Sequence, residues 1–160
     1  AGHIGIRTKR LGCEVETKLV AKGVSDENAK EWASTIASEF GKIKKDSTEI
    51  EQLAHISPEE HELVERLVNA LASENRAPEK EELRLLRTKS KAVDIALFGR
   101  MLASSPDYNV EAACQVAHGI SVHSVAIEDD YFTAVDDLNQ TGDQGAARQD
   151  GPANHHLWVQ

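Results

Sequence analysis

Apolar residues recur every three or four positions in two long stretches of the chain, and each stretch predicts a helix. The first covers residues 25–40, where Ser25 is suited to cap the start, two acidic residues follow it, and Gly41 ends the pattern. The second begins at residues 57–60, where the order Ser-Pro-Glu-Glu is a capping box with proline at the first helical position, and it continues to residue 71. Each helix has one apolar face, so we expect the two to pack in a bundle.

Two shorter patterns add to this bundle. Residues 15–21 predict a short helix that ends before Gly23, and a third amphipathic stretch starts after Pro78 and carries Leu83 and Leu86. We therefore expect residues 1–90 to form a helical subdomain with polar outer faces.

The pattern changes after residue 90. Apolar side chains alternate with other residues at 93–98 and again from 114 to 122, which is the two-residue period of a strand. The alanines around the second stretch are equally consistent with a helix. We interpret residues 91–127 as a few strands, the last of them ending near Val125. The expected fold class is α+β, a helical bundle with an incomplete sheet of a few strands.

The charge is distributed unevenly along the chain. The 160 residues carry 18 Lys and Arg against 27 Asp and Glu, a net charge of −9, and most of the acidic excess lies in residues 91–160. Proteins that bind phosphates along their whole surface are rich in Lys and Arg, so the composition argues against a free-standing nucleic-acid binder. Two basic runs are exceptions, residues 7–10 and the group Lys42, Lys44 and Lys45, although solvated surface positions are the simpler interpretation of both.

Composition also limits the class of protein. Hydrophobic residues make up 40% of the chain and aromatic residues only 4%, which is enough for an aliphatic core. No apolar run approaches the roughly 18 residues of a membrane span, and no basic-then-apolar start resembles a signal peptide. Cys13 and Cys114 fit no short-spaced metal or redox motif, so we expect a reducing cytosol.

No group of residues in the sequence predicts catalysis. His118 and His123 would lie on opposite faces of a strand, and no Cys or Glu completes a metal-binding spacing with them. The adjacent acids at 129–130 and 136–137 are typical of solvated segments rather than of a catalytic pocket. The sequence has no phosphate-binding glycine loop and no nucleophile motif. We therefore expect a protein that is not an enzyme and that uses no metal or cofactor.

Tyr131 and Phe132 are the least ordinary local feature. They are adjacent in a chain with few aromatic residues, and they follow directly on three acids. Neighbouring side chains on an extended segment point to opposite sides, so both rings cannot enter one core. One ring is then available to stack on a base or on a partner side chain, although a core ring beside a rim ring is equally consistent with the sequence.

Three blocks of sequence in this half of the chain are specific enough to compare with known families. They read V-D-I-A-L-F-G-R-M-L at 93–102, Q-V-A-H-G-I-S-V-H at 115–123 and D-D-Y-F-T-A-V-D-D-L at 129–138. In their residues, order and separation, the blocks closely resemble the sequences of CasC-type backbone subunits of the type I-E CRISPR surveillance complex, Cascade. The likeness covers about residues 90–139, and residues 3–11 are similar to the segment that enters the family's helical region.

The resemblance implies a hand-like subunit with an RNA-recognition-motif-like sheet as palm, a helical insertion as fingers and a long loop as thumb. Residues 1–90 would be fingers-like, 91–127 partial palm strands and 128–145 a thumb-like loop. Such subunits polymerise along the guide RNA, and each thumb wedges the duplex between guide and target without cutting it. Base pairing reads the sequence while protein holds the backbone. The implied partners are guide RNA, the target DNA strand, copies of this chain and other Cascade subunits, in the cytoplasm.

Six residues would contact RNA by this resemblance: Arg100, Met101, Tyr131, Phe132, Thr133 and Val135. Met101 would lie at a duplex kink, and Phe132 is the ring expected to stack. Arg100 would meet phosphate, with a salt bridge to an acid such as Asp94 as the alternative. The acids at 136–137 are expected to cap the thumb or to hold it to a neighbouring subunit rather than to touch RNA.

The chain departs from the family at both ends. By the resemblance it starts after the family's first strand and basic segment, and residues 146–160 match nothing in the family's C-terminal palm. We therefore expect a fragment with an unmatched, disordered tail at 146–160, as a frame change or a truncated gene would give. Two other classes of function stay open. One is a helical protein–protein interaction module without RNA binding in this form, and the other, more remote, is a metal-dependent hydrolase.

Overall fold

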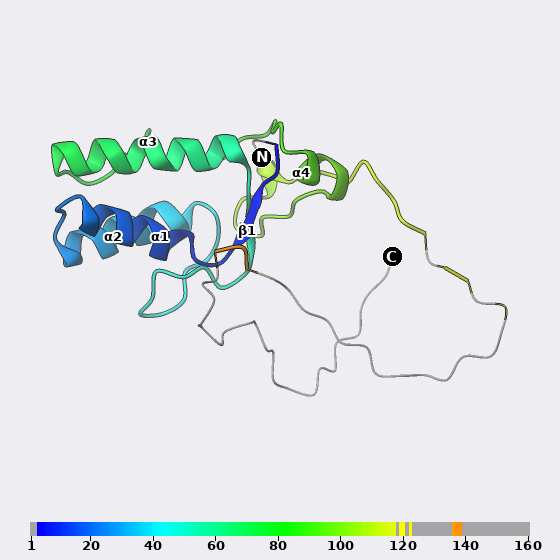
Figure 1. Ribbon diagram of the computed structural model, residues 1–160, viewed down its shortest axis with the longest axis horizontal. Helices are drawn as coiled ribbons and strands as arrows, with labels where there is room; N and C mark the ends of the chain where they lie inside the picture. Colours follow the sequence, from blue (N-terminus) through cyan, green and yellow to red (C-terminus); the bar gives the residue numbers. More distant parts are fainter. Residues whose placement is uncertain (1–2, 118, 121, 123–135, 139–160) are drawn as a thin grey trace.

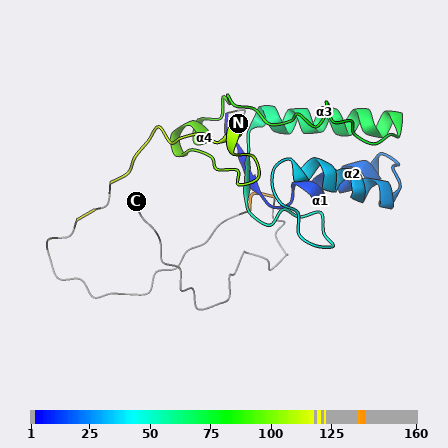
Figure 2. The same ribbon diagram turned by 180° about the vertical axis from the view of Figure 1, so that it is seen from behind.

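The computed structural model describes residues 3–117, 119–120, 122 and 136–138, and all statements about the structure concern these residues. In chain order its elements are β1 (Ile6–Thr8), α1 (Leu11–Ala21), α2 (Asp26–Ser38), β2 (Ala54–Ile56), α3 (Pro58–Glu74), α4 (Val93–Phe98) and a 3₁₀ turn (Pro106–Tyr108). The long helices α1, α2 and α3 lie side by side at one end, while α4 lies at the other end with β1 between them (Figures 1 and 2). The expected class is confirmed, because the fold is α+β with a small, incomplete sheet.

The two best-defined helices of the sequence form where they are predicted. Ser25 caps α2, and its hydroxyl accepts a hydrogen bond from the Asn28 N–H at 3.4 Å. The capping box of α3 is complete: the Ser57 hydroxyl accepts from the Glu60 N–H at 3.2 Å, and the Glu60 carboxylate accepts from the Ser57 N–H at 2.9 Å. Helix α1 is also present, but it begins at Leu11 rather than at Val15.

The prediction of a helix after Pro78 is wrong. Residues 80–83 form only a turn, and the chain then runs irregularly to α4. Glu82 accepts two hydrogen bonds from the Arg76 guanidinium, each 2.7 Å long, and a third from the Glu79 N–H. These side-chain bonds hold the segment in a turn, since polar side chains that bond nearby backbone compete with helical bonding.

The prediction of a strand at 93–98 is also wrong, because these residues form the short helix α4. The sequence there is almost continuously apolar, and such a run does not distinguish a strand from a helix by its period. Only Ile95 of this helix is buried, while Val93, Leu97 and Phe98 are exposed. The described residues 114–117, 119–120 and 122 form no strand either.

The sheet lies in the part of the chain that was expected to be purely helical. Strands β1 and β2 pair antiparallel in the register Ile6 with Ile56, Arg7 with His55 and Thr8 with Ala54. Because β2 leads through Ser57 directly into α3, this pairing ties the start of α1 to the start of α3.

The core is aliphatic, as the composition predicts, and lies between α1, α2 and α3. It holds Leu11, Val15, Leu19, Ala29, Trp32, Ala33, Ile36, Ile56, Val64, Val68 and Leu71 among its buried side chains. The loop after α2 packs closely against α1 at Gly12, where an added Cβ would lie only 2.0 Å from the Thr48 carbonyl oxygen. None of the described helices combines the length and apolar character that a bilayer crossing requires.

Candidate nucleic-acid interface

The segment after α4 presents Met101 to solvent between two buried neighbours. Gly99 ends the helix at a φ of +76°, which favours glycine, and the chain then pairs with Val110 through two backbone hydrogen bonds of 2.9 Å at Arg100. In this extended stretch the exposed fraction alternates: 5% for Arg100, 80% for Met101 and 3% for Leu102. The Met101 side chain is therefore accessible to an external ligand, as the sequence comparison predicts.

Arg100 points into the protein instead. Its Nη1 lies 2.6 Å from Glu60 Oε2, and both side chains are completely buried. Its Nη2 donates to the carbonyl oxygens of Arg87 and Tyr108 at 3.0 and 3.2 Å. The expectation that Arg100 meets phosphate is therefore corrected: its guanidinium is enclosed by its own chain, in an internal salt bridge to Glu60 rather than to Asp94.

Asp94 has a different role. Both of its carboxylate oxygens accept from the Gly5 N–H at 3.0 Å, and Oδ2 lies 2.7 Å from His55 Nε2. The hydrogen bonds from Gly5 and His55 lower the pKa of the Asp94 carboxyl against the opposing effect of its partial burial. This acid joins α4 to the sheet.

A cleft of about 300 Å³ opens beside Met101. One wall is residues 101–104, and the other is formed by residues 40–42 and 50–53 of the loop that links α2 to β2. Lys42 and Glu51 form an ion pair of 3.0 Å on this second wall. Its lining combines apolar side chains such as Phe40, Ile50 and Leu102 with this ion pair.

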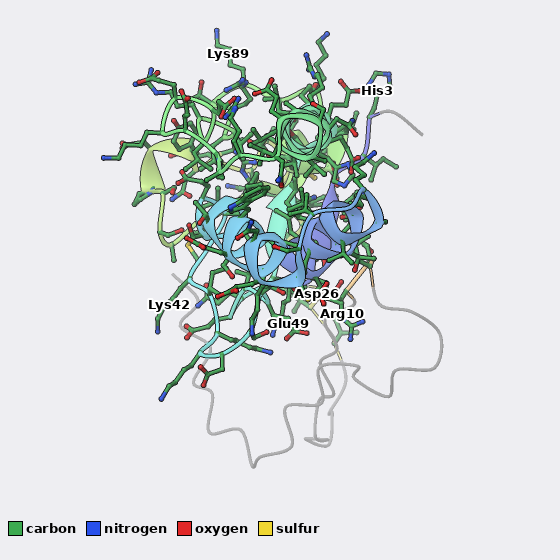
Figure 3. The ribbon with its side chains drawn as sticks, turned by 90° about the vertical axis from the view of Figure 1, so that its left-hand side faces the viewer. His3, Arg10, Asp26, Lys42, Glu49 and Lys89 are labelled. Carbon is green, nitrogen blue, oxygen red and sulfur yellow. The ribbon has the colours of Figure 1, made fainter. Side chains whose placement is uncertain are left out.

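The two basic runs of the sequence are neighbours in space. The Ile50 N–H donates to the Lys9 carbonyl oxygen at 2.9 Å, which fixes the lysine-bearing loop against residues 7–10. Arg10 and Lys42 lie on the same side of the molecule, opposite Lys89 (Figure 3). Lys44 pairs with Glu49 at 2.6 Å, so the region is only partly positive. Both basic runs can be recognised in the sequence, but nothing in the sequence indicates that they lie side by side in the fold.

Asp136 and Asp137 lie against the same basic segment. Asp136 accepts from the Thr8 hydroxyl at 2.7 Å and from the Lys9 N–H at 2.8 Å. Asp137 accepts from the Arg7 N–H at 2.7 Å and returns a backbone bond to the Arg7 carbonyl oxygen at 2.9 Å. Both carboxylates therefore bind β1 of their own chain.

The other predicted RNA-binding residues, Tyr131, Phe132, Thr133 and Val135, lie outside the described residues. The same is true of the histidines considered as metal ligands, His118 and His123, and of the acids at 129–130. The structure thus places Met101 beside the loop that carries Lys42, and it places both that loop and the acids at 136–137 against residues 7–10. The stacking ring stays a prediction from the sequence.

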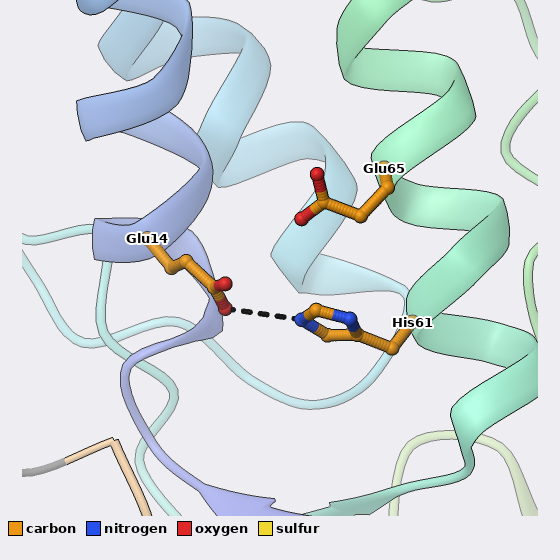
Figure 4. Close-up of side chains that lie close together, drawn as sticks. All are labelled: Glu14, His61 and Glu65. Carbon is orange, nitrogen blue, oxygen red and sulfur yellow. Dashed lines mark hydrogen bonds and ion pairs between the residues drawn. The ribbon is translucent and has the colours of Figure 1, made fainter. Parts of the chain in front are cut away.

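A cluster that the sequence reading did not single out joins α1 to α3. Glu14 points from α1 toward His61 of α3, with Glu14 Oε2 and His61 Nε2 3.3 Å apart, and Glu65 lies one turn further along (Figure 4). The Lys18 ammonium binds both carboxylates, at 2.6 Å from Glu14 and in close contact with Glu65. His61 and Glu65 are four positions apart on a predicted helix and therefore share a face. This spacing is the feature of the sequence that could have indicated the cluster.

The charges of this cluster compensate one another. The hydrogen bond from His61, helped by Lys18, lowers the pKa of Glu14 to about 2. The same bond raises the pKa of His61 above its usual value, against the opposing effect of burial. Glu14, His61 and Glu65 are near enough to share a metal ion, but the ammonium already lies between the carboxylates. The cluster is best explained as an electrostatic link between two helices.

Comparison with known protein families places the chain in one of them. A family model described as "CT1975-like protein", of the CRISPR-associated group, matches residues 1–150. No curated protein and no solved structure matches the chain. The matched range includes the three blocks at 93–138 and the helical region before them.

Proposed function

This chain belongs to the CT1975-like family of CRISPR-associated proteins, and on that premise we propose that it is a non-catalytic structural subunit of an RNA-guided surveillance complex in the cytoplasm. Its proposed partners are guide RNA, the target DNA strand, copies of itself and other subunits of a Cascade-type complex. Family membership supports the CRISPR-associated role, and the three sequence blocks support the narrower assignment to the guide-RNA backbone of type I-E.

The observation that carries the proposal is the position of Met101. A methionine that is 80% exposed between two buried residues presents most of its apolar surface to solvent. Methionine is polarisable and adapts to flat apolar faces, which includes nucleobases. Met101 lies beside a cleft whose lining includes Lys42, which is paired with Glu51, so in this proposal a nucleic-acid phosphate would compete with Glu51 for the ammonium.

In this proposal the sugar–phosphate backbone of the RNA is contacted by residues 7–10 and by the lysines of the loop between α2 and β2. Arg100 does not contact it. Arg7, Lys42 and Lys45 are exposed on neighbouring segments. A chain with a net charge of −9 binds phosphate weakly by itself. Several copies along one guide RNA multiply such weak contacts, because each bound copy holds the RNA near the next.

The proposal assigns this chain no bond-breaking step. Among the described residues, Glu14, His61 and Glu65 form a group of ionisable side chains, and Lys18 is paired with both of its carboxylates. The exposed Met101 and the basic runs serve to bind and to shape a nucleic acid, and cutting is left to a separate nuclease.

Fluorescence anisotropy with single-stranded RNA tests the proposal. We expect binding that weakens between two salt concentrations, since phosphate contacts release counterions. Phe132→Ala should weaken it by about 5- to 150-fold, the range for losing one contact between a base and an aromatic ring, and Met101→Ala should weaken it as well. Val93→Ala removes a similar exposed apolar side chain from α4 and should have no effect. Binding that is absent, or equal in all four proteins, would refute the proposed function.

The second candidate is a protein–protein interaction module that binds no RNA in this form. The observation that favours it is α4, whose side chains Val93, Leu97 and Phe98 are exposed together. Val93 and Leu97 are four positions apart on the helix and so share a face, and exposed apolar side chains that are grouped in this way are typical of protein contacts. If the anisotropy shows no RNA binding while Phe98→Ser abolishes self-association in sedimentation velocity, this candidate replaces the first.

A further inference from the structure

Two pairs of ionisable side chains face each other between α1 and α3. Glu14 and Lys18 are four positions apart on α1, and His61 and Glu65 are four positions apart on α3, so each pair lies on one face of its helix. The His61 ring points at the Glu14 carboxylate, and Glu65 lies one turn further along the same helix (Figure 4). Imidazole nitrogen and carboxylate oxygen are both ligands of Zn²⁺. Three of the four side chains are therefore of the type that binds this metal.

The three ligand atoms are nearly as close together as a metal ion needs. Two ligands of a tetrahedral Zn²⁺ are roughly 3.3 Å apart when each bond is about 2.0–2.1 Å long. Glu14 Oε2 and His61 Nε2 already have this separation, 3.3 Å. All three ligand atoms lie within 4.8 Å of one another, so Glu65 has to approach by at most about 1.5 Å, the difference between these two distances. Glu65 is long and partly exposed, so a rotation of its side chain completes the set.

Lys18 occupies the position that the ion would take. Its ammonium is 2.6 Å from Glu14 Oε1 and in close contact with Glu65 Oε1, so it supplies one positive charge to two carboxylates. A divalent ion compensates both carboxylates and also bonds the imidazole. The ammonium is carried on a flexible four-carbon stem and is partly exposed, so it can turn away. A cleft of about 260 Å³ gives it room and gives an ion access; its lining is Arg10, Cys13, Glu14, Thr17, Lys18 and Leu138.

We propose that Glu14, His61 and Glu65 bind a divalent transition-metal ion of the Zn²⁺ type, which displaces the Lys18 ammonium and joins α1 to α3 in its place. A mixed set of imidazole and carboxylate ligands suits such an ion better than Mg²⁺ or Ca²⁺, which prefer oxygen ligands alone. The ion links the two helices and takes part in no reaction. Neither the site nor its test depends on RNA binding.

Calorimetric titration of the full chain with ZnCl₂ tests the site through its competing lysine. Lys18→Met keeps a long side chain but removes the ammonium, and it should tighten Zn²⁺ binding by about 2- to 30-fold, the range for two ion pairs that no longer have to be broken. Lys30→Met is the same change at an exposed position of α2 and should leave the affinity within about twofold of wild type. If Lys18→Met binds Zn²⁺ no more tightly than Lys30→Met, the proposal is overturned.

Removing a ligand should have the opposite effect. His61→Gln should weaken Zn²⁺ binding by about 100-fold or more, because the loss of even an outer-shell partner costs about 10- to 100-fold. Glu65→Gln alters a partly exposed side chain and should weaken it in the same direction. His3→Gln removes an exposed histidine elsewhere and measures binding by other imidazoles. If His61→Gln loses no more affinity than His3→Gln, the ion binds adventitiously and the site does not exist.

NMR and thermal unfolding locate the ion directly. Saturating Zn²⁺ should shift the Nε2 resonance of His61, which is assigned by its loss in His61→Gln. It should also raise the melting temperature of wild type but not of His61→Gln, since an ion that binds only the folded chain stabilises it. A cooperative melting transition before Zn²⁺ is added shows that each variant is folded. A His61 resonance that does not move at saturation would contradict the proposal.

Discussion

Neutralising Glu60 is the most informative test of what holds the fold together. Glu60 is completely buried, and its carboxylate accepts from the Ser57 N–H at 2.9 Å, the Arg87 N–H at 2.8 Å and Arg100 Nη1 at 2.6 Å. It therefore caps α3, holds the segment before α4 and neutralises a buried guanidinium. Arg100 in turn donates to the carbonyl oxygen of His55 in β2, so the pair joins α3, β2 and the segments on either side of α4.

Glu60→Gln keeps the volume of the side chain but removes its charge. Glutamine still serves in a capping box, so the helix cap survives. The buried Arg100 cation loses its counter-charge, and leaving one partner of a buried ion pair alone costs about 3–5 kcal/mol. At about 2–4 °C per kcal/mol for a chain of this size, the melting temperature should fall by roughly 6–20 °C.

Thermal and urea unfolding followed by circular dichroism measure this loss. Glu62→Gln is the matched control, the same change on an exposed position of the same helix, and it should stay within about 0.5 kcal/mol of wild type. The double variant Glu60→Gln/Arg100→Met removes the stranded cation and should be more stable than Glu60→Gln alone. If Glu60→Gln is no less stable than Glu62→Gln, the charge of Glu60 does not stabilise the fold by compensating the buried Arg100 cation, and the reasoning is refuted.

Two further predictions concern packing and pH. Gly12→Ala would place a Cβ against the Thr48 carbonyl oxygen and should destabilise the fold by about 1–3 kcal/mol, whereas Gly119→Ala, with open space around it, should not; urea unfolding compares them. Glu14 has a pKa lowered to about 2, so its stabilisation is present above its ordinary value of 4.5 and is lost as pH falls toward 2. His61 has a raised pKa, so its contribution is complete below its ordinary value of 6.5 and is lost as pH rises above that value. Glu14→Gln should flatten both limbs of the stability–pH curve, and an unchanged curve would contradict the link.

Local signals predicted part of the fold. The capping box at residues 57–60 and the cap at Ser25 are recognisable because a helix start is encoded within four residues. The strands β1 and β2 have three residues each and pair across two helices, so neither has enough length to show a period. The apolar run of α4 carries the same residues that a buried strand would, and its type is decided by Gly99 and by packing at Ile95.

The site was predictable only where sequence blocks carried it. The resemblance predicts RNA contact at both Met101 and Arg100. The structure shows that Met101 is exposed, and its contact with RNA stays a prediction, whereas Arg100 is buried in an ion pair with a residue 40 positions earlier. Nothing in the sequence near Arg100 marks Glu60 as its partner. The bond between Thr8 and Asp136 spans 128 positions, and it too exists only once the sheet has formed.

The most direct test of the proposed role is co-purification. The chain is expressed with the other subunits of its complex and with a guide RNA, recovered through a tag on another subunit, and the bound RNA is extracted and sized. The account predicts that the chain is recovered in several copies per complex with RNA of guide length, and that Met101→Ala combined with Phe132→Ala lowers its recovery. A complex that forms and retains its guide RNA without this chain would contradict it.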